Sequence, residues 1–300
     1  MKSISLQIPA TSANLGPGFD CMAVALDLWS EVEFRLTGNS IGVAITGEGA
    51  GSLPDDQSNL IARAFLRVYA QCEQHPPPGV EITCINRVPI GSGLGSSAAA
   101  VLAGLVGANA LLGSPLSEGE IFALGTQIEG HPDNLVPAYL GGLTLVSQAG
   151  REVIARKIEI PPMQAAVVVP KISLLTEETR RALPLQVALT EAVQNIGNAA
   201  LVVEALRTGD VDLLAQVCGD NLHQPYRLPL IPGAQAALEA AQNLGAAAVL
   251  SGGGPGVIAF VDDRPGEAAA VMAAEFEKAG LESRTFLTDT TNQGAADTII

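Results

Sequence analysis

The stretch that most constrains this chain runs over residues 89–100 and reads PIGSGLGSSAAA. Its three glycines, Gly91, Gly93 and Gly95, stand two apart, and glycine allows a backbone to adopt positive φ and to approach a ligand closely. A small-residue helix pattern follows over 101–112, so the free N–H groups and the positive dipole end of a helix adjoin the loop. A strand, a glycine loop and a helix in this order predict a phosphate site.

Two familiar phosphate loops do not match this stretch. The Walker loop has a lysine after its last glycine, and this loop has none. The dinucleotide fingerprint needs an acidic residue on a second strand about 20 residues later, which is not found here. Ser96 and Ser97 are expected to cap the helix, and a hydroxyl there can reach a metal ion held by phosphates. The loop therefore predicts a nucleotide site of another kind; the alternative is a loop that only caps a helix.

Composition limits the classes of protein and partner. A chain of 300 residues suits one large domain or two ordinary ones. Its residues are 48% hydrophobic but only 4% aromatic, which predicts an aliphatic core. The net charge of −15 argues against nucleic acid and acidic membrane surfaces as partners.

Cysteine usage and the apolar runs indicate a cytoplasmic protein. Cys21, Cys72, Cys84 and Cys218 are scattered without a CxxC pair, which is typical of reduced thiols and of a chain without a zinc site. The first residues are too polar for a signal peptide, and no apolar run reaches membrane-spanning length. We therefore expect a soluble chain without a membrane partner.

Hydrophobic periodicity predicts a mixed α/β chain. Strands are expected over residues 3–8, 22–28, 31–36, 41–46, 80–85, 143–147, 167–169, 247–250, 257–261 and 284–287. Helices are expected over residues 59–71, 101–112, 115–129, 187–206 and 267–279. The second half alternates strands and helices in a way that favours a ferredoxin-like plan.

Two further loops collect polar residues. Residues 9–20 are expected to form a rigid loop, because two glycines and two prolines stand between Asn14 and Asp20. Residues 129–134 hold His131 among carboxylate and amide side chains. The alternatives are an ordinary connection in the first case and a structural histidine in the second.

Three glycine-bearing loops in this chain resemble those of the GHMP kinases. They are PATSANLGPGFD at 9–20, PIGSGLGSSAAA at 89–100 and SGGGPGV at 251–257. The third departs from the family pattern, because Gly253 replaces an alanine and Gly256 replaces a serine or threonine. A phosphate contact from a hydroxyl there is therefore left open. Thr11 stands where serine is common.

Three other segments resemble the family members that phosphorylate homoserine. They read EGHPDNLVPAYLGG at 129–142, TRRALP at 179–184 and HQPYRLPLIPG at 223–233. The resemblance implies an α/β fold of the two-layer α+β kind in two domains. Residues 1–160 would form an ATP-binding domain like ribosomal protein S5 domain 2, with a left-handed βαβ crossover. Residues 161–300 would form a ferredoxin-like domain that contributes to substrate binding.

The resemblance implies an ATP site around the glycine loop. The loop would hold the ATP phosphates, and the adenine would lie at the start of the helix over 59–71. By resemblance, Ser97 and Glu129 bind Mg²⁺, and a hydroxyl with one carboxylate suits an ion that keeps its waters. The implied nucleotide-binding residues are Asn59, Pro89, Ile90, Gly91, Ser92, Gly93, Leu94, Gly95, Ser96, Ser97 and Ala98.

The same resemblance implies a site for L-homoserine. Asp20 suits the substrate ammonium, while Arg180 and Arg227 suit its carboxylate, which a guanidinium binds bidentately. Asn134 would lie near the δ-hydroxyl and act in catalysis together with Ser97 and Glu129. The residues implied to orient the substrate are Asn14, His131 and Asn134.

The acceptor of the hydroxyl proton is open. Several sugar and mevalonate relatives have an aspartate base where Asn134 aligns, and an amide cannot take a proton at neutral pH. Either the γ-phosphate of ATP or the neighbouring Asp133 accepts it. The simpler hypothesis is catalysis by positioning alone.

The implied activity is ATP-dependent phosphorylation of L-homoserine to O-phospho-L-homoserine for threonine biosynthesis. One alternative is a sister GHMP kinase of the mevalonate, shikimate or sugar type, and the other is a non-catalytic ligand-sensing relative. Arg180 and Arg227 favour a substrate with a carboxylate, and an intact Ser97 and Glu129 favour catalysis. The oligomeric state is open, with a homodimer kept as an option.

Overall fold

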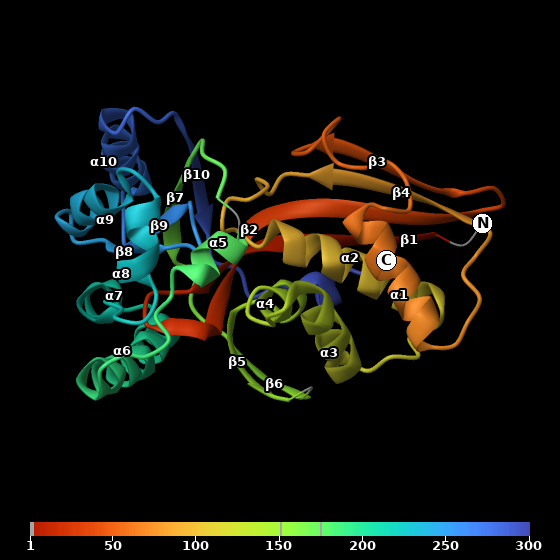
Figure 1. Ribbon diagram of the computed structural model, residues 1–300, viewed down its shortest axis with the longest axis horizontal. Coiled ribbons are helices and arrows are strands. Elements are labelled where there is room, and N and C mark those ends of the chain that lie inside the picture. Colours follow the sequence, from red (N-terminus) through yellow and green to blue (C-terminus); the bar gives the residue numbers. More distant parts are fainter. Residues whose placement is uncertain (1–2, 151, 175) are drawn as a thin grey trace.

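The computed structural model describes residues 3–150, 152–174 and 176–300, which form two α/β halves side by side (Figure 1). The first half is a sheet in the order β3-β4-β2-β5-β6, with β1 paired to β2. Its strands are β1 (Ser3–Asn14), β2 (Gly18–Thr37), β3 (Ile41–Gly47), β4 (Gly79–Asn86), β5 (Leu143–Ala149) and β6 (Glu152–Ile158). Its helices are α1 (Leu60–Gln71), α2 (Ser96–Leu111), α3 (Glu118–Glu129) and α4 (Leu135–Leu140).

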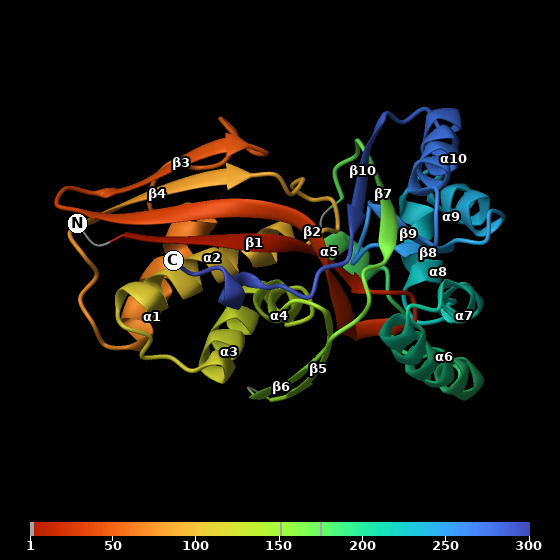
Figure 2. The ribbon, with the colours of Figure 1, turned by 180° about the vertical axis from the view of Figure 1, so that it is seen from behind.

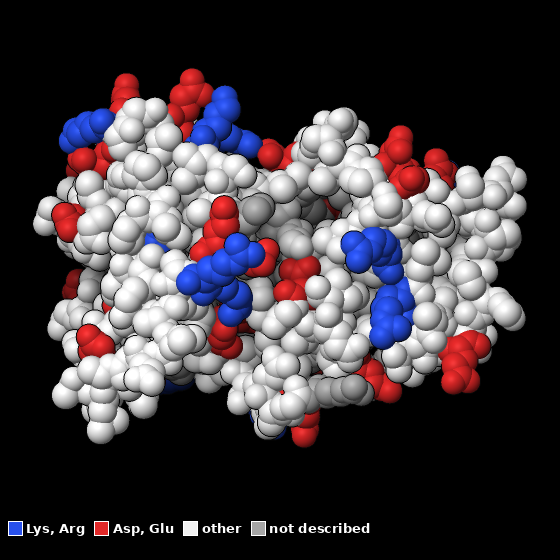
Figure 3. Space-filling model, in the orientation of Figure 1, with Lys and Arg blue, Asp and Glu red and all other residues white. Residues whose placement is uncertain are grey.

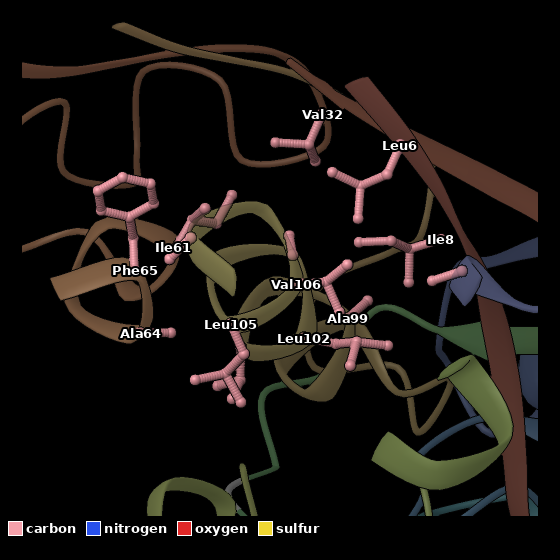
Figure 4. Close-up of a cluster of buried hydrophobic side chains, with 14 of the residues drawn as sticks. Leu6, Ile8, Val32, Ile61, Ala64, Phe65, Ala99, Leu102, Leu105 and Val106 are labelled. Atoms are coloured by element: carbon pink, nitrogen blue, oxygen red, sulfur yellow. The ribbon is translucent and has the colours of Figure 1, made fainter. Parts of the chain in front are cut away.

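Helix α2 lies at the centre of the first core. It is apolar on all sides, which is typical of a buried helix, and Figure 4 shows it between α1 and the strands. A Cβ at Gly104 would lie 2.3 Å from the carbonyl oxygen of Ile61, so the glycine allows α1 and α2 to touch. This packing holds the N-terminus of α2, and with it the glycine loop, against the sheet.

The second half confirms the ferredoxin-like plan. Its four strands pair antiparallel in the order β10-β7-β9-β8, with helices packed against them. The strands are β7 (Gln164–Pro170), β8 (Ala247–Leu250), β9 (Val257–Val261) and β10 (Ser283–Asp289). The helices are α5 (Thr176–Arg181), α6 (Leu189–Thr208), α7 (Val211–Val217), α8 (Gln224–Arg227), α9 (Ala234–Gln242) and α10 (Pro265–Lys278), with the 3₁₀ turn η1 (Leu228–Leu230). The last 3₁₀ turn, η2 (Ala295–Asp297), belongs to the first half, where Ala295 is part of the core.

The expected loop over residues 9–20 is wrong, because most of it is strand. β1 continues to Asn14 and β2 begins at Gly18, so only residues 15–17 form the turn. The register shifts between Pro9 and Ala10, which places the proline at an irregularity where a strand tolerates it. The far end of this hairpin enters the second half, where the Gly252 N–H donates to the Ala13 carbonyl at 3.1 Å.

Other expected elements are confirmed with their ends moved, but helices α4, α5 and α9 are absent from the sequence-based prediction. The strands expected over 22–28 and 31–36 are one long strand, β2. The edge strand β6 is absent from the sequence-based prediction, because its charged residues obscure the alternation. Helix α1 connects β3 to β4 along the chain, and these two strands pair in parallel, so the three elements form the βαβ unit of this half.

The two halves share a core. Ala10, Leu15 and Met22 of the hairpin pack with Val202 and Phe260 of the second half. The end of the chain returns to β1, where Ser5 and Ile300 exchange backbone hydrogen bonds of 3.0 and 2.9 Å (Figure 2). The domain boundary expected between residues 160 and 161 therefore stays a prediction. The tip of the β1–β2 hairpin packs in the second half, and the end of the chain packs in the first.

The last features of the fold are the distribution of surface charge and the apolar character of the helices. Figure 3 shows the acidic and basic residues of one face scattered among wide uncharged areas. Within the described residues, no helix combines the length and the apolar character needed to cross a membrane.

Candidate active site

The glycine loop has the backbone that the sequence predicts. Gly91, Gly93 and Gly95 have φ of 65°, 82° and 72°. The expected serine cap is wrong: Gly95 is the N-cap of α2, and Ser96 and Ser97 are its first helical residues. Since glycine has no side chain to accept from the first turn, the N–H groups there are open to an anion.

The loop between β8 and β9 locks onto the glycine loop. The Ser251 hydroxyl donates to the Gly93 carbonyl at 2.9 Å, and the Gly256 N–H donates to the Ser92 carbonyl at 3.0 Å. A Cβ at Gly256 would lie 2.4 Å from that same carbonyl oxygen. The departure at 256 from the family pattern therefore has a steric reason, because a hydroxyl residue does not fit this contact.

An apolar cavity of about 310 Å³ lies between α1, α2 and the sheet. Its lining includes Asn59, Leu60, Ile90 and Ser97. The Asn59 amide donates to the Pro54 carbonyl at 2.7 Å and accepts from the Ile61 N–H at 2.9 Å. Asn59 therefore caps α1 and lines this cavity, and its contact with adenine stays a prediction.

A second, polar cavity adjoins the first and shares the start of α2 with it. Its lining brings together residues from both halves of the chain. All the residues predicted to bind the substrate or Mg²⁺ are among them: Asn14, Asp20, Ser97, Glu129, His131, Asn134, Arg180 and Arg227. Asp133, the rival base, lines it as well.

Ser97 and Glu129 meet beside the glycine loop. The Ser97 hydroxyl donates to Glu129 Oε1 at 2.8 Å. Burial raises the pKa of Glu129 above its usual value, against the lowering effects of Ser97 and His131. Among the described residues no cluster of three or more His, Cys, Asp or Glu side chains forms a metal cage. One hydroxyl and one carboxylate at a phosphate site fit Mg²⁺, which usually takes its other ligands from phosphate and water.

Asp20 and Arg180 bind each other across the two halves. Arg180 Nη1 and Nη2 donate to the two oxygens of Asp20, each at 2.9 Å. Asn14 holds the Asp20 turn, since its amide oxygen accepts from the Asp20 N–H at 3.0 Å. The two charges predicted to bind opposite ends of an amino acid are thus paired with each other in the structure.

Arg227 is a buried cation, with 2% of its surface exposed. Its guanidinium donates to the carbonyl oxygens of Thr179 and Gly252 and to His223 Nδ1, at 3.3–3.4 Å. Burial, followed by the charge of Arg180, lowers its pKa. No described carboxylate forms an ion pair with it. A desolvated cation that faces a cavity suits an anionic ligand.

His131 and Asp133 form a tight pair in the same cavity. His131 Nδ1 lies 2.5 Å from Asp133 Oδ1. Burial opposes the imidazolium, but the hydrogen bond and the charge of Asp133 outweigh it and raise the pKa of His131 above 6.5. Asn134 Nδ2 is 3.5 Å from the same carboxylate oxygen.

Sequence reasoning missed two residues that shape the arginine pocket. The ring of Phe19 lies under both guanidiniums, as in cation–π contacts. Its centroid is 5.9 Å from Cζ of Arg180 and 5.0 Å from Cζ of Arg227. His223 stacks on Phe19 at 5.2 Å, and its Nε2 is 2.8 Å from the Gly16 carbonyl. The available signals were an aromatic ring in a polar loop and the histidine that opens HQPYR.

Comparisons with known proteins agree with this geometry. Family models match residues 59–142, as the GHMP kinases N terminal domain, and 202–278, as GHMP kinases C terminal. The homoserine kinase of Moorella thermoacetica is 45% identical over 279 residues, which cover 92% of this chain and 94% of the relative. This chain belongs to the homoserine kinases of the GHMP kinase family. The homoserine kinase of Prochlorococcus marinus is 42% identical over 94% of this chain and 91% of the relative.

Solved structures confirm the fold expected of a homoserine kinase. The crystal structure of homoserine kinase from Cytophaga hutchinsonii matches with a TM-score of 0.85 at 31% identity, covering 98% of this chain and 97% of the other. A mevalonate kinase matches with a TM-score of 0.70 at 18% identity, over 96% and 99% of the two chains. That second likeness concerns the fold alone.

Proposed function

We propose that this homoserine kinase transfers the γ-phosphoryl group of ATP to the δ-hydroxyl of L-homoserine, giving O-phospho-L-homoserine and ADP. The observation that carries the proposal is the buried Arg227 at one wall of a cavity whose other wall is the phosphate loop. A sugar or a simple alcohol offers no carboxylate to such a cation. An amino acid with a terminal hydroxyl offers both a carboxylate for this cation and an acceptor for the phosphoryl group.

ATP would occupy the apolar cavity and the loop. The adenosine would lie beside Asn59, and the phosphates would accept hydrogen bonds from N–H groups at the start of α2. Ser97 and Glu129 would hold Mg²⁺, which neutralises charge on the phosphates during transfer. Glu129 must be ionised for this role, because only the carboxylate is a good ligand for the ion.

L-Homoserine would bind between the two halves. Its carboxylate would pair with Arg227 and Arg180, and its ammonium with Asp20. The ion pair between Asp20 and Arg180 would then be replaced by ion pairs of each residue with the substrate. His131 and Asn134 would orient the hydroxyl. Transfer of a phosphoryl group depends mainly on positioning and charge, so the proposal leaves the proton to the γ-phosphate or to Asp133.

The test is ADP release from Mg·ATP with L-homoserine and with two analogues that each lack one charge. 3-Aminopropan-1-ol lacks the carboxylate and 4-hydroxybutanoate lacks the ammonium. We expect kcat/KM to be highest for homoserine and to fall for both analogues. Turnover of mevalonate, shikimate or galactose in its place would favour a sister kinase. Binding of homoserine without ADP release would favour a ligand sensor.

Three wider features belong to the same proposal. The product is an intermediate on the way to threonine, which places the chain in threonine biosynthesis. All four cysteines are free thiols, which supports a cytoplasmic location. A homodimer is supported by helix α6, on which the apolar side chains of Leu189, Val193 and Ile196 are exposed.

A further inference from the structure

Thr11 is not among the predicted site residues, yet it forms hydrogen bonds both with the glycine loop and with Asn134. The residue is 1% exposed, in β1 below the glycine loop. Its hydroxyl donates to Asn134 Oδ1 at 2.9 Å, and its backbone N–H donates to the Leu94 carbonyl at 3.1 Å. One residue therefore connects the phosphate loop to the amide expected at the substrate hydroxyl.

The hydrogen bonds around Asn134 determine which way its amide points. The end opposite Thr11 faces Asp133 Oδ1 at 3.5 Å, and a carbonyl oxygen there would be repelled by the carboxylate. The NH₂ group must therefore take that side, and the oxygen accepts from Thr11. Since 3.5 Å is long for a hydrogen bond, the amide hydrogens stay available to a ligand.

Gly95 makes room for this contact. A Cβ on residue 95 would lie 2.2 Å from Thr11 Oγ1 and 3.1 Å from Asn134 Oδ1. The last glycine of the loop thus serves two purposes, because it begins α2 and admits the threonine–asparagine pair beneath it. The separation between the phosphate donor loop and the amide is then determined by packed atoms.

We propose that Thr11 is a positioning residue that holds Asn134 as a hydrogen-bond donor to the acceptor hydroxyl oxygen, at a defined place relative to the phosphate loop. Because the Asn134 oxygen is held by Thr11, the amide meets the substrate oxygen through its NH₂ group, and the substrate O–H is directed to another acceptor. The oxygen of the substrate hydroxyl keeps a lone pair for the new bond to Pγ. At the same time the bond between Pγ and the oxygen that bridges it to the β-phosphate of ATP breaks. ADP leaves with that electron pair, and the proton goes to the γ-phosphate or to Asp133.

The test compares variants of the full chain that keep or lose the hydroxyl. Thr11→Val is nearly isosteric and should lower kcat by about 10- to 100-fold, because small misplacements of reacting groups have effects of this size. The KM for ATP should stay close to the wild-type value. Thr11→Ser keeps the hydroxyl and should retain most of the turnover that valine loses.

A double-mutant cycle distinguishes positioning from general damage. In an Asn134→Ala background, Thr11→Val should change kcat by less than about twofold, because the amide it positions is gone. Equal losses in both backgrounds, or a serine variant as poor as the valine variant, would overturn the proposal. Thr11→Ala repeats the test if valine does not fold, and failure of both to fold would show a purely structural role.

This inference rests on the proposed function, but the two can fail separately. If the wild-type chain does not phosphorylate homoserine, the proposed function is wrong and no variant is needed to show it. If the wild type is active and the cycle is additive, only the role of Thr11 is wrong. Thermal unfolding of each variant without ligands serves as the control for folding.

Discussion

Glu129 is a residue whose charge has opposite effects on stability and on the proposed activity. Its pKa is higher in the folded chain than its usual 4.5, chiefly through burial. A carboxyl group of this kind destabilises the fold at pH values above both pKa values and not below them. Glu129→Gln should therefore raise the unfolding midpoint at pH 7, with a smaller gain near pH 4.

The same variant should lose about 100-fold or more in kcat at saturating Mg²⁺, as is usual when an electrostatic group of a transfer site is removed. Thermal unfolding at the two pH values and steady-state kinetics check the two halves of the prediction. A variant with near wild-type turnover would show that Glu129 has no metal role.

Arg227 should affect one substrate and not the other. Loss of a charge-assisted pair in a closed site costs about 1.5–3 kcal/mol, so Arg227→Leu should raise the KM for homoserine by roughly 10- to 150-fold. The KM for ATP should change little. Arg181→Leu is the matched control, since that side chain is exposed and pairs with Glu177 on the surface. Equal effects on both substrates would exclude a carboxylate contact.

Asp133 should act mainly through the pKa of His131. In Asp133→Asn the raising effect of the carboxylate is lost and burial dominates, so the pKa of His131 should fall from above 6.5 to below it. Titration of the imidazole signals by NMR measures this directly, with His75 and His223 as internal references. The matching kinetic expectation is a loss in kcat smaller than about 10³-fold; a larger loss, with the acidic limb of the pH profile abolished, would make Asp133 the base.

At the scale of elements, the site depends on the contact between two loops. Gly256→Ser places a Cβ 2.4 Å from the Ser92 carbonyl oxygen, so the loop between β8 and β9 must move away from the glycine loop. Overpacking of this kind costs about 1–3 kcal/mol. We expect a lower free energy of unfolding in urea together with a higher KM for ATP.

Gly253→Ala is the matched control for the loop contact. The nearest atom to its Cβ is Thr179 Oγ1 at 3.1 Å, so this side chain needs to move by only a few tenths of an ångström. Alanine is also the family residue at this position, so this variant should stay close to the wild type. An unchanged KM for ATP in the serine variant would show that the contact does not shape the phosphate site.

At the scale of the molecule, helix α6 presents an apolar face to solvent. Leu189, Val193 and Ile196 are 79%, 61% and 70% exposed, and no charged residue stands between Glu191 and Glu204. A chain of net charge −15 repels its copies over most of its surface, and this uncharged helix face is where two copies can meet with the same surface. It supports a two-fold homodimer.

If the proposed dimer forms through this face, Ile196→Glu should convert it to a monomer without loss of fold, as measured by light scattering coupled to size-exclusion chromatography. Leu287→Glu is the control, because this leucine of β10 is 56% exposed and lies away from α6. A wild-type chain that is monomeric at micromolar concentration would contradict the dimer.

The sequence by itself determined the local features of the site and the family. Glycines at 91, 93 and 95 specify positive φ, and a helix of small residues after them needs no tertiary information to be recognised. The motifs also predicted the chemical types that line the polar cavity. These features depend on neighbouring residues, so they can be deduced from spacing and residue type.

Only the tertiary structure decided which of these residues meet. The Asp20–Arg180 pair joins residues 160 positions apart, and the Thr11–Asn134 pair joins residues 123 apart. It also converted most of the expected loop over 9–20 into strand. The physical reason is that long-range contacts follow from how two halves pack, and packing supplies hydrogen-bond partners that the local pattern of prolines and glycines does not reveal.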